Sequence, residues 1–184
     1  LNGGGDDTLN VNDTSDTAAN TGLLTASSLT GLGMAAGINY SSIETLLVGL
    51  GSGGNTFNLR STAANTTTTL RTGGGNDTIN VGSGAGTGSG GNANGVGGKL
   101  TIEAQGGTDI LNVDDTTDGA SNPGLLTNNR LTGLGLGAND TNKGIEYLGV
   151  ETLNINLGAG GNTFNIQSTY DSAVSTLNSG AGAD

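Results

Sequence analysis

The sequence contains no cysteine and no histidine in its 184 residues. The lack of cysteine excludes disulfide bonds, and the lack of both residues excludes zinc sites built from thiolate or imidazole ligands. It also leaves no thiol or imidazole to act as a catalytic nucleophile or base. Aromatic residues make up only 3% of the chain, so any core must be thin and built mainly from aliphatic side chains.

Positive charge is scarce as well. Five Lys and Arg stand against 16 Asp and Glu, which gives a net charge of −11. Five positive charges are too few for a phosphate-binding patch, so we expect neither nucleic acid nor an anionic membrane surface as a partner. No apolar run approaches the roughly 20 residues that span a bilayer, so membrane insertion is not expected. The acidic surface suits cations or simple solubility.

Glycine is abundant, with 37 residues, and Asn, Thr and Ser fill most of the remainder. Such a composition can indicate disorder. Against that interpretation, Leu, Ile and Val recur at regular places, and one phrase keeps returning: a glycine turn, an Asp or Asn, and a short strand with alternating apolar residues. The phrase occupies residues 3–11, 53–59, 73–81, 106–113 and 160–166.

A longer repeat contains these phrases. Residues 7–32 match residues 109–134 at an offset of 102, and from residue 37 the offset is 107 because the second copy has five extra residues within 137–143. We expect this polar insertion on a surface loop. The sequence thus divides into copy 1 (residues 8–77), a short piece (78–109) and copy 2 (110–184), within one continuous segment (1–184). The short piece contains residues 82–98, a glycine-rich loop that we expect to bulge from the body and to be mobile.

A spacing of 22 residues lies inside the repeat, for example from Asn55 to Asp77 and from Asn162 to Asp184. No stretch shows the apolar periodicity of a helix. The prediction is an all-β fold, a right-handed parallel β-helix (β-solenoid) with coils of about 22 residues. Its expected inward residues are Leu9, Val11, Leu29, Leu46, Phe57, Leu59, Leu70, Ile79, Val81, Leu100, Ile102, Leu111 and Val113.

The turn phrase resembles the calcium-binding nonapeptide of RTX (haemolysin-type) proteins, most closely at residues 73–81. The resemblance implies Ca²⁺ as a ligand at the position of the family's Asp. Here that position holds Asp7, Asp77, Asp109 and Asp184, with Asn55 and Asn162 in the intervening coils. RTX motifs recur every nine residues, however, whereas these recur at 22 or more and alternate Asp with Asn. This departure favours the alternative role, in which the side chains accept backbone N–H groups in turns and form a stacked hydrogen-bonded ladder.

A second acidic group follows one strand of each copy. It comprises Asp13 and Asp16 in copy 1, and Asp114, Asp115 and Asp118 in copy 2. Either the pairs offer two carboxylates to a cation, or they stabilise a turn; their mutual repulsion favours the turn.

Catalysis has little support in the sequence. Carboxylate pairs can hydrolyse glycosides, but Glu44 and Glu151 occupy equivalent repeat positions, which suits a structural role better than a unique active site. The paired aromatic residues, such as Phe57 and Phe164, are interpreted as packing inside the coils. We therefore expect that the protein is not an enzyme.

The chain also resembles the long repeats of very large bacterial surface and exported proteins, through residues 7–13, 29–34 and 43–46. This resemblance implies an extracellular structural role, as a filament, stalk or adhesin shaft. The expected partners are copies of the chain itself or flanking repeats stacked end to end. This expectation also rests on the last residues, which stop at a turn whose earlier versions lead into a strand. The alternative is a calcium-stabilised RTX-like module of an exported enzyme or toxin.

Overall fold

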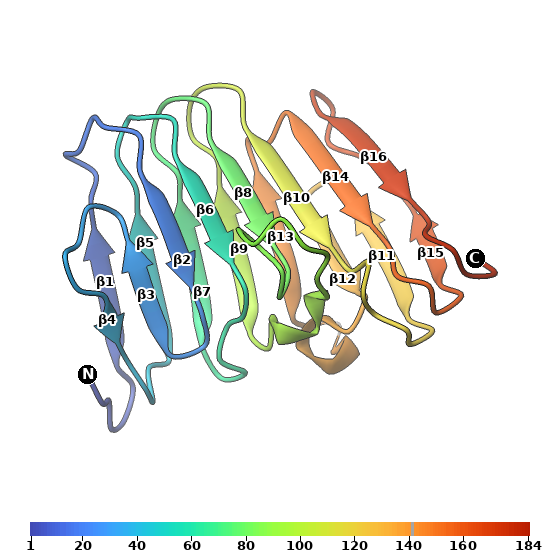
Figure 1. Ribbon diagram of the computed structural model, residues 1–184, viewed down its shortest axis with the longest axis horizontal. Helices are drawn as coiled ribbons and strands as arrows, with labels where there is room; N and C mark the ends of the chain where they lie inside the picture. Colours follow the sequence, from blue (N-terminus) through green and yellow to red (C-terminus); the bar gives the residue numbers. More distant parts are fainter. Residues whose placement is uncertain (141) are drawn as a thin grey trace.

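The computed structural model describes residues 1–140 and 142–184 and shows an all-β molecule whose strands lie in two facing sheets (Figure 1). The first sheet has the order β1 (Thr8–Asn12), β5 (Thr45–Gly49), β7 (Thr67–Arg71), β9 (Lys99–Glu103), β13 (Gly144–Leu148), β12 (Arg130–Gly133), β11 (Pro123–Thr127) and β15 (Thr163–Ile166). The second has the order β16 (Val174–Asn178), β14 (Thr152–Asn156), β10 (Ile110–Asp114), β8 (Thr78–Val81), β6 (Thr56–Leu59), β2 (Thr21–Leu24), β3 (Ser28–Gly31) and β4 (Ile38–Asn39). Two short 3-10 segments, Ala93–Gly95 and Leu136–Asn139, complete the described elements.

Most neighbouring strands are parallel because the chain alternates between the sheets and returns beside an earlier strand. We call a strand of the first sheet together with the next strand in the second sheet a rung. The 22-residue spacing is the register between adjacent rungs: Thr45 pairs with Thr67, and Phe57 pairs with Ile79. The predictions of an all-β fold and of parallel stacking are thus confirmed.

Each copy also contains antiparallel pairing that the sequence pattern did not predict. In copy 1, β2 pairs with β3 and β3 with β4; in copy 2, β11 pairs with β12 and β12 with β13. These two hairpin units account for the longest spacings between rungs, whereas the glycine-rich stretch of residues 82–98 lengthens the spacing between β8 and β10. A buried tyrosine closes each first turn, since the Tyr40 hydroxyl donates to the Thr25 carbonyl at 2.6 Å and the Tyr147 hydroxyl to the Thr127 carbonyl at 2.9 Å.

The repeated phrase at residues 29–33 and 131–135 owes its regularity to backbone shape. Gly31 and Gly133 have φ values of 83° and 82°, in the left-handed region that favours glycine. A Cβ atom on Gly31 would come within 2.0 Å of the Thr21 carbonyl oxygen. The hairpin therefore requires glycine for two separate reasons.

The core lies between the sheets and forms one continuous cluster. Eleven of the thirteen residues predicted to point inward are at most 1% exposed. The other two, Leu9 and Val11, pack against the cluster from β1 at the end of the first sheet and are only partly buried. The alternating pattern therefore located the core correctly.

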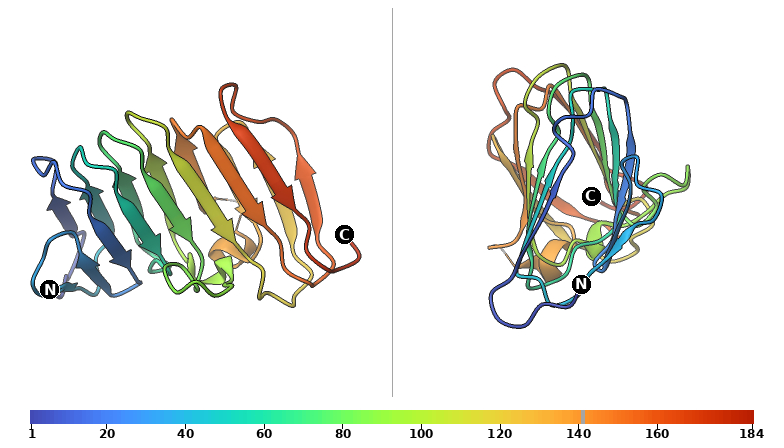
Figure 2. Two further views of the ribbon diagram at one scale, coloured as in Figure 1. Left: turned by 45° about the horizontal axis from the view of Figure 1, so that its top comes forward. Right: turned by 90° about the vertical axis from the view of Figure 1, so that its left-hand side faces the viewer.

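The glycine loop, defined as residues 82–98, bulges from the body only in part, contrary to the prediction that the whole loop does so. Its tip, residues 86–90, is exposed and projects from the side of the molecule (Figure 2). Its second half does not bulge, because Ala93 and Val96 are fully buried. The loop folds back there and packs on the next rung.

The insertion of copy 2 lies mostly at the surface, as expected. Ala138, Asn139 and Asp140 are exposed, while Gly137 is buried; Thr141 lies outside the described residues. The two copies also exchange sheets: the hairpin unit of copy 1 belongs to the second sheet, and that of copy 2 to the first. The exchange arises because the chain passes from one sheet to the other an odd number of times between β1 and its counterpart β10.

Candidate functional site

A line of polar side chains marks the corner where the chain enters the second sheet. The residue directly before each of five parallel strands is acidic or an amide, and we call this set the corner ladder. Its members are Asn20, Asn55, Asp77, Asp109 and Glu151.

Each residue of the corner ladder is joined to the next by one hydrogen bond, which a backbone N–H donates to a side-chain oxygen. The N–H groups of Asn20 and Asn55 donate to Asn55 Oδ1 and Asp77 Oδ1 at 3.0 and 2.6 Å. Those of Asp77 and Asp109 donate to Asp109 Oδ1 and Glu151 Oε2, both at 2.7 Å. The corner N–H groups would otherwise be buried without a partner, which costs about 1–3 kcal/mol each. The acidic and amide residues therefore fasten rung to rung.

The opposite corner, which leads into the first sheet, repeats the arrangement in two pieces. The Asp7 N–H donates to Glu44 Oε2 at 2.8 Å near the N-terminal end. The N–H groups of Asn122 and Asn162 donate to Asn162 Oδ1 and Asp184 Oδ1 at 3.1 and 2.7 Å near the C-terminal end. Glu44 and Glu151 thus have the same role, as their repeat positions suggested.

The four aspartates predicted to bind Ca²⁺ do not all come together. Asp77 and Asp109 are adjacent members of the corner ladder, whereas Asp7 and Asp184 lie at opposite ends of the molecule (Figure 1). Among the described residues, no group of three or more Asp, Glu, His or Cys side chains is placed to hold a metal ion. Calcium binding at these residues stays a prediction.

Asp77 and Asp109 are each 1% exposed, and the Oδ2 atom of each has no hydrogen-bond partner within the described part of the chain. Burial raises the pKa of both carboxyl groups. The N–H groups that they accept lower it, and in Asp109 the nearby charges of Asp77 and Glu151 raise it further. The ladder therefore stabilises its rungs while holding two costly negative charges inside the protein.

The second acidic group has different surroundings in the two copies. In copy 2, Asp115 is fully buried and Asp118 is 8% exposed, because the glycine loop covers them. Burial, followed by the charges of Asp118 and Asp114, raises the pKa of Asp115 to about 6. In copy 1, the counterparts Asp13 and Asp16 are only partly buried. The structure supports the turn interpretation in both copies, since Asp16 and Asp118 accept the N–H groups of Ala18 and Ala120, both at 2.8 Å.

A second ladder, of asparagine side chains, was not predicted. On the outer face of the second sheet, the side-chain amide of Asn80 donates to Asn58 at 3.0 Å, Asn112 donates to Asn80 at 2.9 Å, and Asn154 donates to Asn112 at 2.9 Å. The sequence contained a signal for this ladder, because each asparagine stands between two inward-facing apolar residues and occupies the same position in its strand. Like the corner ladder, it links rungs along the stacking direction.

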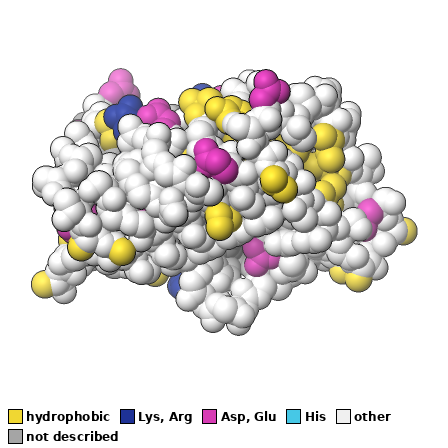
Figure 3. Space-filling view, turned by 90° about the horizontal axis from the view of Figure 1, so that it is seen from above, with side chains coloured by type: hydrophobic (Ala, Val, Ile, Leu, Met, Phe, Trp, Pro, Cys, Tyr) yellow, Lys and Arg dark blue, Asp and Glu magenta, His cyan; other side chains and the backbone are white. Residues whose placement is uncertain are grey.

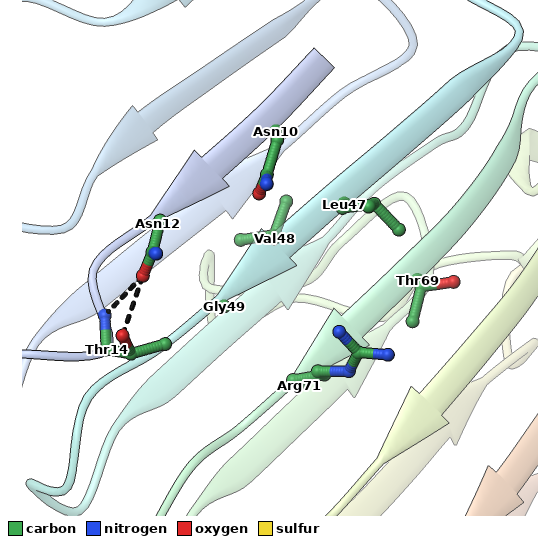
Figure 4. Close-up of a pocket in the computed structure, with 8 residues that line it drawn as sticks. All are labelled: Asn10, Asn12, Thr14, Leu47, Val48, Gly49, Thr69 and Arg71. Atoms are coloured by element: carbon green, nitrogen blue, oxygen red, sulfur yellow. Dashed lines mark hydrogen bonds between the residues drawn. The ribbon is translucent and has the colours of Figure 1, made fainter. Parts of the chain in front are cut away.

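One surface hollow has several polar side chains in its wall. The pocket in Figure 4 crosses β1, β5 and β7, with Asn10, Asn12, Thr14, Thr69 and Arg71 in its wall. Asn12 Oδ1 accepts both the N–H and the hydroxyl of Thr14, at 3.0 and 2.7 Å. These groups can form hydrogen bonds, but they include no carboxylate to transfer a proton.

No family model matches the chain, and neither curated proteins nor solved structures yielded a match. The interpretation of function therefore rests on the molecule itself.

Proposed function

We propose that this chain is a structural repeat segment of an extracellular bacterial surface protein, acting as a filament, stalk or adhesin shaft. In this proposal the rungs are coils of a right-handed parallel β-helix that lengthens by stacking coil on coil. No catalytic role is proposed. The acidic side chains act as hydrogen-bond acceptors between rungs, as in the contact of Asp77 with Asn55.

The observation that carries the proposal is the exposed core at the C-terminal end. Ile166 is 51% exposed, whereas its repeat counterpart Leu59 is fully buried. Phe164 is partly exposed, whereas its counterpart Phe57 is 1% exposed. Leu177 on β16, in register with the buried Ile155, is only partly buried, whereas its counterpart Leu70 is 1% exposed. Apolar surface of this kind favours a further rung, because burying one such side chain is worth about 1.5–3 kcal/mol.

The N-terminal end supports the same conclusion. Leu9 and Val11 on β1 are partly exposed, while their counterparts Leu111 and Val113 are fully buried on β10, which lies between β8 and β14 in its sheet. Within the described residues, β1 and β16 each pair with a single strand, so both ends present an open strand edge. Open edges of parallel sheets readily pair with another chain.

The sides of the molecule suit a rod in an aqueous environment. Figure 3 shows a face made largely of uncharged polar and backbone atoms, with scattered acidic groups and few basic ones. In the described part of the chain, no helix is long and apolar enough to cross a membrane. The extracellular location rests on the composition and on the resemblance to bacterial surface repeats.

The experiment is sedimentation velocity and negative-stain electron microscopy of the 184-residue protein over a range of concentrations. The proposal predicts linear, end-to-end particles that lengthen with concentration. The variant Ile166→Asp, at an inward position in register with the buried Leu126, should abolish them. Leu148→Asp is the matched control, since Leu148 is 46% exposed on β13, away from both ends, and it should leave assembly unchanged. A protein that remains monomeric at high concentration contradicts the proposal.

The alternative, a calcium-stabilised RTX-like module, is favoured by one observation. Asp77 Oδ2 and Asp109 Oδ2 are buried without a hydrogen-bond partner in the described residues, and a cation would compensate their charge. Its test is set out in the Discussion.

A further inference from the structure

The two repeat copies contain the same polar turn in a covered and an open form. In copy 2 the turn follows β10 and carries Asp114, Asp115 and Asp118. In copy 1 it follows β1 and carries Asn12, Asp13 and Asp16 at the matching positions. The covered form therefore shows what the open form is built to bind.

Three donors of the glycine loop cover the turn in copy 2. Gly91 N–H donates to Asp114 Oδ2 at 2.7 Å, Ala93 N–H to Asp115 Oδ1 at 3.0 Å, and Asn94 Nδ2 to Asp118 Oδ2 at 3.1 Å. In return, Thr117 N–H donates to the Gly91 carbonyl at 2.9 Å. The turn thus binds the loop through three carboxylate groups and one backbone N–H. On the side of the loop, all of the bonding groups except the Asn94 amide belong to the backbone.

The open turn of copy 1 already has the internal geometry of the covered one. Asp16 accepts the Ala18 N–H at 2.8 Å and the Asn20 amide at 2.7 Å; Asp118 accepts the equivalent groups, both at 2.8 Å. Asn12 and Asp114 both accept two hydrogen bonds from the threonine two residues later. Because the turn does not have to rearrange, binding there avoids a conformational cost.

The strand beside the turn is open in the same way. β10 pairs with β8 on one edge and β14 on the other, and β8 leads directly into the glycine loop. Its counterpart β1 pairs with β5 only, within the described residues. In copy 2, residues 77–98 lie against this strand edge and this turn, whereas in copy 1 none of the described residues does.

We propose that the N-terminal end of this protein binds a strand–glycine loop segment with the pattern of residues 77–98, supplied by a further repeat unit of the same type. Its strand pairs with the open edge of β1. Its loop donates to Asp13 and Asp16, as Ala93 and Asn94 donate to Asp115 and Asp118. The inference deepens the proposed function, on which it rests, by specifying what one end accepts.

One substitution between the copies supplies a sharp test. Asn12 stands where copy 2 has Asp114, and its amide nitrogen replaces the oxygen that accepts Gly91 N–H. Asn12→Asp restores that acceptor, and a hydrogen bond to a charged group corresponds to about a tenfold gain in affinity or more. Loss of the Asp13 carboxylate should weaken binding by a similar factor.

The experiment measures binding of a fluorescently labelled synthetic peptide, residues 77–98 with blocked ends, to the full 184-residue protein by fluorescence anisotropy at pH 7.5. The protein variants are Asn12→Asp, Asp13→Ala and Asp171→Ala. Asp171 is an exposed acid beside β16, so its variant controls for the loss of one negative charge. A peptide of the same composition in scrambled order controls for sequence, and circular dichroism verifies that each variant is folded.

The inference predicts binding that Asn12→Asp strengthens about tenfold, Asp13→Ala weakens about tenfold and Asp171→Ala leaves unchanged. Absence of binding to the wild-type protein and to Asn12→Asp at millimolar peptide overturns it. Binding that ignores both turn variants also overturns it, because the peptide then occupies another edge such as β16. The two proposals fail separately, because a monomeric protein that binds the peptide refutes the proposed assembly and leaves the inference standing.

Discussion

Phe57 and Phe164 occupy the same repeat position in different surroundings. Phe57 is 1% exposed and packs against Gly22, where a Cβ atom would come within 2.6 Å of its ring. Phe164 lies on β15 at the C-terminal end and is only partly buried. The pair separates the effect of the residue from the effect of its environment.

We predict that Phe57→Ala lowers the free energy of unfolding by about 3–5 kcal/mol, because it removes a buried ring and leaves a cavity. Phe164→Ala should cost less than about 2 kcal/mol, because solvent already reaches that ring. Urea denaturation of the dilute protein, followed by circular dichroism, measures both. Equal losses would show that the end of the molecule is covered in solution.

Asp115 makes the folding stability depend on pH in the direction opposite to that given by most carboxylates in ion pairs. Burial raises its pKa to about 6 in the folded state, above the value of about 3.9 for an unfolded chain. Its contribution to stability is therefore fully present below about pH 4 and is lost as pH rises through 6. The raised pKa values of Asp77 and Asp109 act in the same direction.

We predict that the unfolding free energy increases on going from pH 7.5 to pH 5, with about 1–1.5 kcal/mol of the change due to Asp115. Asp115→Asn should flatten the profile, since its Oδ1 still accepts Ala93 N–H without carrying a charge. Thermal melting across this pH range tests the prediction. A profile that falls toward acid in the wild-type protein contradicts it.

At the scale of single residues, the sequence was sufficient to find the core but not the partners of the acids. Alternation in a strand shows which side chains face inward, and Ile79 and Leu111 behaved accordingly. The acceptor role of Glu151 depends on Asp109, 42 residues earlier in the chain. Such a contact follows from the register between rungs, which the sequence specifies only through the complete fold.

Among the elements, the corner ladder allows the most direct comparison between two roles of its acidic side chains, as hydrogen-bond acceptors or as ligands of a cation. If it acts only as a set of hydrogen-bond acceptors, each acid is already used by the next rung, as Asp109 is by Asp77. A bound cation would instead stabilise the folded state by mass action.

We expect that the melting temperature is unchanged by millimolar Ca²⁺ and by chelator, because the described residues form no cluster of three ligands. A rise with Ca²⁺ that chelator reverses, and that Asp77→Asn removes, would establish the calcium-stabilised alternative. Asp6→Asn is the matched control, since Asp6 is an exposed acid outside both ladders.

The glycine loop and the hairpin units show where element-level prediction fails. Glycine-rich composition indicates a high conformational entropy in the unfolded chain, but it does not reveal that Ala93 and Asn94 meet acceptors on the next rung. The hairpins were hidden because β2 and β3 have the same short apolar pattern as strands that pair in parallel. The chain reverses at Thr25–Ser28 between β2 and β3 and again after Gly31 between β3 and β4, and the positive φ of Gly31 is not visible in apolar periodicity.

For the whole molecule, the repeat of about 102 residues predicted which segments are equivalent but not how they are arranged. Equivalent segments lie in opposite sheets, as β1 and β10 do. The environment of a residue therefore depends on its distance from an end more than on its place in the repeat. β7 and β16 are equivalent strands, yet β7 pairs with β5 and β9, whereas the described residues pair β16 with β14 alone.

This arrangement predicts a gradient of local stability along the stacking direction. Each rung contacts only its neighbours, so an interior rung is stabilised from two sides and an end rung from one. Opening of an end rung therefore costs less free energy than global unfolding. We predict that amides of β7 and β8 exchange with deuterium at least about tenfold more slowly than those of β16 in the dilute protein. Leu70 and Leu177 form the matched pair, because they occupy the same repeat position at the centre and at the end. Hydrogen exchange followed by mass spectrometry of peptides from both strands provides the measurement.

If the two strands exchange at one rate, the rungs unfold as a single cooperative unit and the nearest-neighbour description fails. If the protection of β16 instead rises with protein concentration toward that of β7, an added rung covers the end, as coil-on-coil stacking requires.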